Sequence, residues 1–159
     1  PGAVQEMIAA GVGNQVTINL GGKIDMPSID RQGEPRMVTG TVKLISNGQF
    51  RNLGPAQTGI LQDMGPTAVL DTGKVEIVVI SRHQEPNDLN CFRSLGIEPT
   101  TKRYLMLKSR IHYRVGFRDL AREVVECAGL GVCTSDYSEI SFENVRRPIY
   151  PLDEIKMRN

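Results

Sequence analysis

The sequence predicts an α+β domain in which a mixed β-sheet is built from two hairpins and one strand-helix-strand crossover, with helices packed on the sheet. The hairpins are predicted from two turn signals, Asn47-Gly48 and residues 71–74, each between apolar stretches. The crossover is predicted from apolar segments at 104–107 and 124–127, which flank a helical pattern. The alternative is an α/β three-layer sandwich.

The first elements follow from the spacing of apolar residues. Residues 3–10 carry them at helical spacing, and Gly11 follows as a stop signal. Residues 16–20 alternate between apolar and polar side chains, which predicts a half-buried strand. Residues 25–36 combine prolines, a glycine and charges, so we expect a loop there.

The first hairpin is predicted from the clearest local signal in the chain. Residues 38–46 and 49–53 flank Asn47-Gly48, and an Asn-Gly pair supplies the two positive φ angles of a type I′ turn. The following residues, 54–66, hold too many glycines and prolines for the interior of an element. We therefore expect an ordered loop over the sheet at that point.

The second hairpin joins residues 67–70 to residues 75–81. Its later strand is apolar almost throughout, which is typical of a central strand covered on both faces. Asn87 or Asp88 can cap the next helix, which should bury Leu89, Phe92 and Leu95. The crossover helix is predicted at about 115–122.

Composition and charge limit the function. A net charge of +1 argues against a nucleic-acid-binding protein. The three cysteines do not form a Cys-x-x-Cys motif, which favours a reducing, cytoplasmic location. No apolar run approaches the roughly 20 residues that cross a bilayer. The chain opens with Pro1 and no initiator Met, so we expect a fragment of a longer protein.

The sequence does not supply a complete catalytic or metal-binding set. It contains two histidines, His83 and His112, and lacks the close pairs that signal a catalytic zinc site. Gly-x-Ser-x-Gly, Walker-type and dinucleotide-binding patterns are also missing. Gly11-Val-Gly13 precedes a predicted strand instead of opening a helix, so it is interpreted as a helix end. We expect no metal ligands in this chain.

A polar cluster follows the predicted strand at 104–107. Lys108, Ser109 and His112 lie where that strand ends and a helix is about to start, a position at which ligands collect in parallel sheets. They are the candidate cleft residues, and Arg82 and Arg114 are candidate substrate-binding residues. The alternative is structural: Lys108 pairs with a nearby acid, Ser109 caps the turn and His112 packs on its neighbour.

Six blocks of sequence support a family assignment. They are Gly21-Gly-Lys-Ile-Asp25, Val38-Thr-Gly-Thr-Val42, Met64-Gly-Pro-Thr-Ala-Val-Leu70, Phe92-Arg-Ser-Leu-Gly-Ile-Glu-Pro99, Leu107-Lys-Ser-Arg-Ile-His-Tyr113 and Arg146-Arg-Pro-Ile-Tyr-Pro-Leu-Asp153. In order and spacing they resemble the C-terminal domain of the microcystinase C (MlrC) family over nearly the whole chain. The segment 127–142 departs from the family pattern.

The resemblance implies that residues 1–159 form a single C-terminal domain of a zinc-dependent metallopeptidase or amidohydrolase. The metal ligands would belong to an N-terminal metallopeptidase domain that this chain lacks, so the fragment alone should be inactive. The family's Lys-Ser-x-x-His pattern matches Lys108, Ser109 and His112, which would then face the interdomain cleft. The implied partners are the N-terminal domain and a peptide or small amide substrate.

Two other functions stay open. In one, the basic stretch 102–122 makes the chain a non-catalytic module that binds an anion or an acidic partner. In the other, the chain is a structural lid or dimerisation domain, and a homo-oligomer is compatible with either role. Neither a nucleic acid nor a membrane is expected as a partner.

Overall fold

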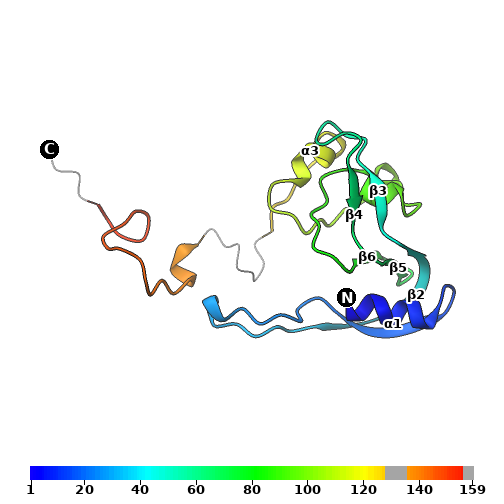
Figure 1. Cartoon of the computed structure of the whole chain (residues 1–159), viewed down its shortest axis with the longest axis horizontal. Helices are drawn as coiled ribbons and strands as arrows, with labels where there is room; N and C mark the ends of the chain where they lie inside the picture. Colours follow the sequence, from blue (N-terminus) through cyan, green and yellow to red (C-terminus); the bar gives the residue numbers. More distant parts are fainter. Residues whose placement is uncertain (128–135, 156–159) are drawn as a thin grey trace. The chain divides into compact units, whose positions relative to one another are not determined.

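The computed structural model describes residues 1–127 and 136–155, and its contacts divide the chain into two compact units (Figure 1). Unit 1 consists of Pro1–Leu20 and Met37–Val124, and unit 2 consists of Gly21–Arg36 and Val125–Asn159. No helix among the described residues has both the length and the apolar character needed to cross a bilayer. Unit 1 contains the hydrophobic core.

The main sheet has four strands in the order β1-β2-β5-β6. Their bounds are Gln15–Leu20, Arg36–Ser46, Thr67–Asp71 and Glu76–Ile80. The β2–β5 and β5–β6 pairs are antiparallel. The β1–β2 pair also runs antiparallel, because Asn14 contacts Val42 while Thr17 contacts Thr39. Strands β3 (Gln49–Arg51) and β4 (Leu61–Asp63) form a second, two-stranded sheet.

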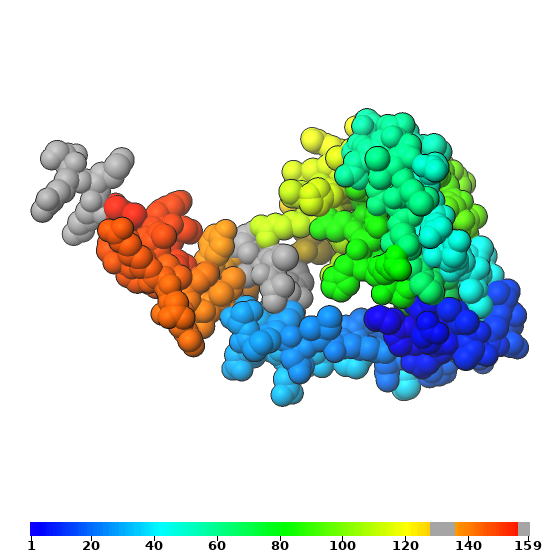
Figure 2. All heavy atoms as spheres, in the orientation of Figure 1, coloured from blue at the N-terminus to red at the C-terminus, as the bar shows by residue number. Residues whose placement is uncertain are grey.

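The main sheet separates two apolar clusters. Helix α1 (Gly2–Ala10) contributes Met7 to the cluster that also contains Val42 and Leu70. In Figure 2 this dark-blue helix lies against cyan and green residues of the same unit. The other cluster includes Phe50, Met64, Val69, Cys91, Leu95, Ile97 and Phe117. Both faces of the sheet are therefore covered over β5, β6 and the end of β2, although no parallel strand is present among the described residues.

The first predicted hairpin is wrong. Strands β2 and β3 do not pair with each other: β2 pairs with β5 and β3 pairs with β4. Gly48 has a positive φ of 75°, but Asn47 does not, so the two residues do not form a type I′ turn. They form a corner between the two sheets. The bent segment formed by β2 and β3 pairs with the segment formed by β4 and β5. Strand β4 lies within residues 54–66, which were predicted to be a loop.

The second predicted hairpin is confirmed. Thr67 pairs with Ile80 and Asp71 pairs with Glu76 across a tight turn. The predicted central position of its second strand is wrong, because β6 lies at the edge of the sheet. Its apolar residues nevertheless serve both faces: Ile77 and Val79 pack with the α1 cluster, and Val78 and Ile80 pack with the other.

The predicted crossover is wrong. Neither 104–107 nor 124–127 forms a strand. Helix α2 spans Asn90–Arg93, and helix α3 spans Tyr113–Phe117, where it continues into the 3₁₀ turn η3 (Arg118–Leu120). A further 3₁₀ turn, η2, spans Pro99–Thr101. The α+β class is confirmed, whereas the described strands give no support to the α/β alternative.

Unit 2 is made of turns. The 3₁₀ turn η1 (Pro27–Ile29) lies beside the bridge between Met26 and Arg31. A second 3₁₀ turn, η4, spans Tyr137–Glu139. Towards the end of the chain, the Arg147 Nε donates to an Asp153 carboxylate oxygen over 2.6 Å, which closes a loop around the two prolines there.

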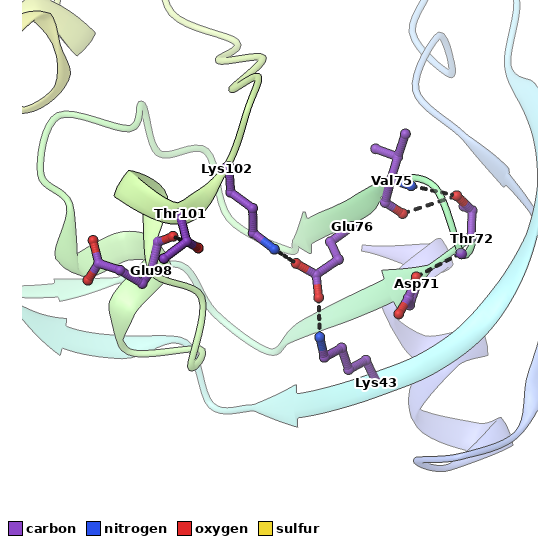
Figure 3. Close-up of polar contacts among 9 residues, drawn as sticks. Lys43, Asp71, Thr72, Val75, Glu76, Glu98, Thr101 and Lys102 are labelled. Atoms are coloured by element: carbon purple, nitrogen blue, oxygen red, sulfur yellow. Dashed lines mark hydrogen bonds and ion pairs between the residues drawn. The ribbon is translucent and has the colours of Figure 1, made fainter. Parts of the chain in front are cut away.

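Glu76 links three segments of unit 1 (Figure 3). Its carboxylate pairs with Lys43, which lies where the β2–β5 register shifts, and with Lys102 after η2. The pKa of Glu76 lies below its ordinary value of 4.5. The hydrogen bond from Lys102 is the largest cause, and the hydrogen bond from Lys43 is the second. The carboxylate is therefore ionised at neutral pH.

Glu76→Gln should lower the free energy of unfolding by about 1 kcal/mol at neutral pH, because partly exposed ion pairs contribute about 0.2–1 kcal/mol each. Since folding lowers the pKa of Glu76, this stabilisation is complete above the unfolded-state pKa and is lost as the pH falls through the folded-state pKa. Urea denaturation at neutral pH and in acid measures it. A difference between the two proteins that persists undiminished in acid would contradict the assignment.

Candidate functional site

The candidate site lies where two connecting segments of unit 1 meet. One is the segment 81–89, which links β6 to α2, and the other is the segment 103–112, which leads into α3. Polar residues of the two segments meet through side-chain contacts between loops and not through parallel strands.

Glu85 is the residue on which the cluster converges. Ser109 Oγ donates a hydrogen bond to Glu85 Oε2 over 2.7 Å, and His112 Nδ1 lies 2.8 Å from the same oxygen. The backbone N–H of Tyr113 donates to Ser109 Oγ over 3.1 Å. Ser109 and His112 are thus brought together by a shared carboxylate, and the first amide of α3 is already occupied by Ser109.

The electrostatics of the cluster favour an ionised Glu85. The hydrogen bond from Ser109, followed by that from His112, holds the pKa of Glu85 below its ordinary value, and the charge of Lys108 acts in the same direction. The side chains of His112 and Glu85 are 63% and 46% exposed. The cluster is therefore open to a ligand and carries an anionic centre flanked by basic groups.

The segment that carries Glu85 is held at both ends. Before it, Arg82 pairs with Asp63 of β4, and Gln84 Nε2 donates to Gln62 Oε1 over 2.7 Å. After it, the carboxylate of Asp88, which is 1% exposed, accepts hydrogen bonds from three backbone amides. These contacts fix the backbone on either side of Glu85.

The structure brings together some of the predicted site residues and separates others. Ser109 and His112 meet at Glu85, and Lys108 lies exposed beside them. Arg82 pairs with Asp63 and so belongs to the support of the loop. Arg114 places its guanidinium 5.9 Å from the ring centre of Tyr113.

Sequence analysis did not single out Glu85. It is the only acid between Arg82 and Pro86, directly after an apolar strand, and that position was the available signal. The charge of Lys108 acts on Glu85 as the least of the causes that shift its pKa.

The part of the chain that the structure describes does not offer a metal site. No group of three or more His, Cys, Asp or Glu residues there is arranged to hold an ion. Of the cysteines, Cys91 is buried and burial raises its thiol pKa to about 12, whereas Cys127 is exposed. Cys133 lies outside the described residues.

Three comparisons relate the chain to known proteins. The model of the family described as "MlrC C-terminus" matches residues 1–144. Microcystinase C from Sphingomonas sp is 30% identical over 156 residues, which cover 98% of this chain and 28% of that protein. The crystal structure of a Mesorhizobium sp. BNC1 protein named "Putative metallopeptidase" has a TM-score of 0.81 and 26% identity, and the match covers 99% of this chain and 31% of that one.

Proposed function

This chain belongs to the MlrC C-terminal family, and from that premise we propose that it is the C-terminal domain of a microcystinase C-like zinc-dependent metallopeptidase or amidohydrolase. In this proposal residues 1–159 act as one domain that contributes to the substrate cleft and to interdomain packing. The family match over residues 1–144 is the observation that carries the proposal.

The metal is assigned to the part of the protein outside this chain. The chain spans 28% of the length of Microcystinase C and 31% of that of the Mesorhizobium protein, so most of each relative has no counterpart here. The described residues do not fit a zinc site. We therefore expect the isolated chain to be inactive. In this proposal it is part of a larger cytoplasmic enzyme, and an N-terminal domain supplies the metal.

In the intact enzyme, Lys108 and His112 would act on the substrate. Both side chains lie at the surface beside the Glu85 carboxylate, and both can carry positive charge. A cationic donor in that position suits a substrate carboxylate or the oxyanion that develops during amide cleavage. Arg114, on α3 next to this cluster, is the candidate for a further substrate contact.

Interdomain packing is proposed for the segment 103–108, which leads into the cluster. Tyr104 is 80% exposed and Met106 is 98% exposed, whereas Leu107 packs against the core. This alternation matches the strand that the sequence predicted there, yet no described strand pairs with it. A segment with bulky, exposed apolar side chains suits contact with another domain.

The experiment uses the intact protein that contains this chain. Lys108→Ala and His112→Ala should each lower kcat/KM for hydrolysis of a linear peptide by about tenfold or more, since a charge-stabilising donor at an oxyanion contributes at least this much. Lys74→Ala, in the exposed β5–β6 turn, is the matched control and should leave kcat/KM unchanged. Unchanged turnover and substrate affinity in both cluster variants would remove the proposed role.

A structural lid or dimerisation role is the second candidate, because of the exposed apolar side chains at 104 and 106. It would be favoured if Tyr104→Ser and Met106→Ser changed the mass measured by light scattering while Lys108→Ala and His112→Ala stayed active. Salt-sensitive binding of an acidic partner by this chain alone would instead favour the anion-binding module.

A further inference from the structure

We propose that Glu85 is a positioning residue that holds His112 by its Nδ1 atom, so that Nε2 is the ring nitrogen presented to the substrate. The inference rests on the proposed function of the cluster and specifies which atom of His112 acts. It also assigns Ser109 a supporting role.

The first step is the chemistry of the His112–Glu85 contact. An ionised carboxylate only accepts hydrogen bonds, and the pKa of Glu85 lies below its ordinary value. His112 Nδ1, 2.8 Å from Oε2, must therefore carry the proton of that bond. In the neutral imidazole the other nitrogen, Nε2, then has a free lone pair; in the imidazolium it is a donor. In either state Nε2 is the atom available to a ligand.

The second step concerns Ser109, because a serine that lies beside a histidine is a candidate nucleophile. Its hydroxyl proton is donated to Glu85 Oε2 over 2.7 Å, and its oxygen accepts from the Tyr113 amide over 3.1 Å. In a serine–histidine pair the imidazole accepts the serine proton, and the histidine here uses Nδ1 to contact Glu85 instead. Ser109 therefore ties the carboxylate to the start of α3.

The third step is the support of Glu85 itself. Gln84 is bonded to Gln62 of β4 on one side, and Asp88 is bonded to the Leu53 and Gly54 amides on the other. The carboxylate thus joins a loop anchored on β4 to the segment that precedes α3. An acceptor fixed from both sides can hold an imidazole in one orientation.

Nitrogen-15 NMR of histidine-labelled intact protein tests the atom assignment, with the His112 signals identified by their loss in His112→Ala. In its neutral form, His112 should carry its proton on Nδ1. In Glu85→Ala the Nδ1 atom no longer has an acceptor, so the proton should move to Nε2. A wild-type His112 protonated at Nε2 would overturn the proposal, whatever the enzyme's activity.

A double-mutant cycle tests the role in catalysis. Glu85→Ala should lower kcat by about 10-fold to 100-fold with little change in KM, and should have no further effect when His112 is already alanine. Glu6→Ala, on α1 across the sheet, is the matched control and should leave kcat unchanged. Since the Glu85 side chain is 46% exposed, the variant should fold.

The outcomes separate the two proposals. If His112→Ala leaves turnover unchanged, the catalytic role proposed for His112 fails, and the NMR result still decides the atom assignment. If His112→Ala lowers turnover but Glu85→Ala does not, the positioning role is overturned. An additive loss in the double variant overturns it as well, because Glu85 would then act independently of His112.

Discussion

Replacing Gly48 with alanine should lower the free energy of unfolding of unit 1 by more than about 4 kcal/mol. A loss of this size has few causes, and a severe steric clash is one of them. Gly48 has a φ of +75°, and an added Cβ would lie 2.0 Å from the carbonyl oxygen of Gly65. That carbonyl accepts a hydrogen bond from Thr67 Oγ1, and the Gly48 carbonyl accepts one from the Met64 amide over 3.0 Å. Urea denaturation followed by circular dichroism measures the loss.

Gly73→Ala is the matched control for this prediction. Gly73 has a φ of +80°, nearly the same as that of Gly48, but beyond its two chain neighbours no heavy atom lies within 4 Å of the position its Cβ would take. Only the left-handed backbone is penalised, at about 1–2 kcal/mol. If the two variants lost equal stability, the close approach of Gly48 to Gly65 would not be the cause.

The same corner explains why the first hairpin was predicted wrongly. Asn47-Gly48 does mark a place where the chain must turn and where glycine is required, and that much is local information. The Asn47 side chain accepts from the Gln49 amide over 3.0 Å, a contact that is also local. Strand pairing is not local: β3 finds its partner only after the loop 52–60. A turn signal cannot distinguish a hairpin from a bend between two sheets.

Other errors have the same origin. The apolar run of β6 indicated correctly that both of its faces are covered, but a sequence does not reveal that β6 has a neighbour on one side only. Residues 104–107 have the apolar character of a strand, yet no described strand pairs with them. The elements whose signals were local, such as α1 and the β5–β6 hairpin, were predicted correctly.

In the candidate site, too, the local contacts could be predicted from the sequence and the non-local ones could not. Ser109 and His112 are three residues apart, so their proximity could be predicted from the sequence. Glu85 lies 24 residues before Ser109, and its contact with the pair depends on how the segment 81–89 is anchored. The chemical roles of Lys108 and His112 stay predictions until the intact protein is assayed.

Asp88→Ala should lower the free energy of unfolding of unit 1 by about 3 kcal/mol or more, because hydrogen bonds to a charged group contribute about 1.5–3 kcal/mol each and their loss leaves shielded donors unpaired. The Asp88 carboxylate is 1% exposed and accepts from Leu53 N over 3.0 Å, from Gly54 N over 2.6 Å and from Asn90 N over 2.7 Å. Chemical denaturation measures the total loss.

Asp71→Ala provides the comparison, since Asp71 accepts a single exposed amide, that of Gly73, over 2.7 Å, and its loss should cost about 1 kcal/mol or less. Hydrogen exchange then locates the effect of Asp88. The Leu53 and Gly54 amides should lose protection in Asp88→Ala before the β5 amides do, because Asp88 is what holds them. Protection that falls uniformly over unit 1 would contradict this local role. A selective loss would mean that the loop carrying Glu85 has been released at one end, so the His112 contact should weaken in the same variant.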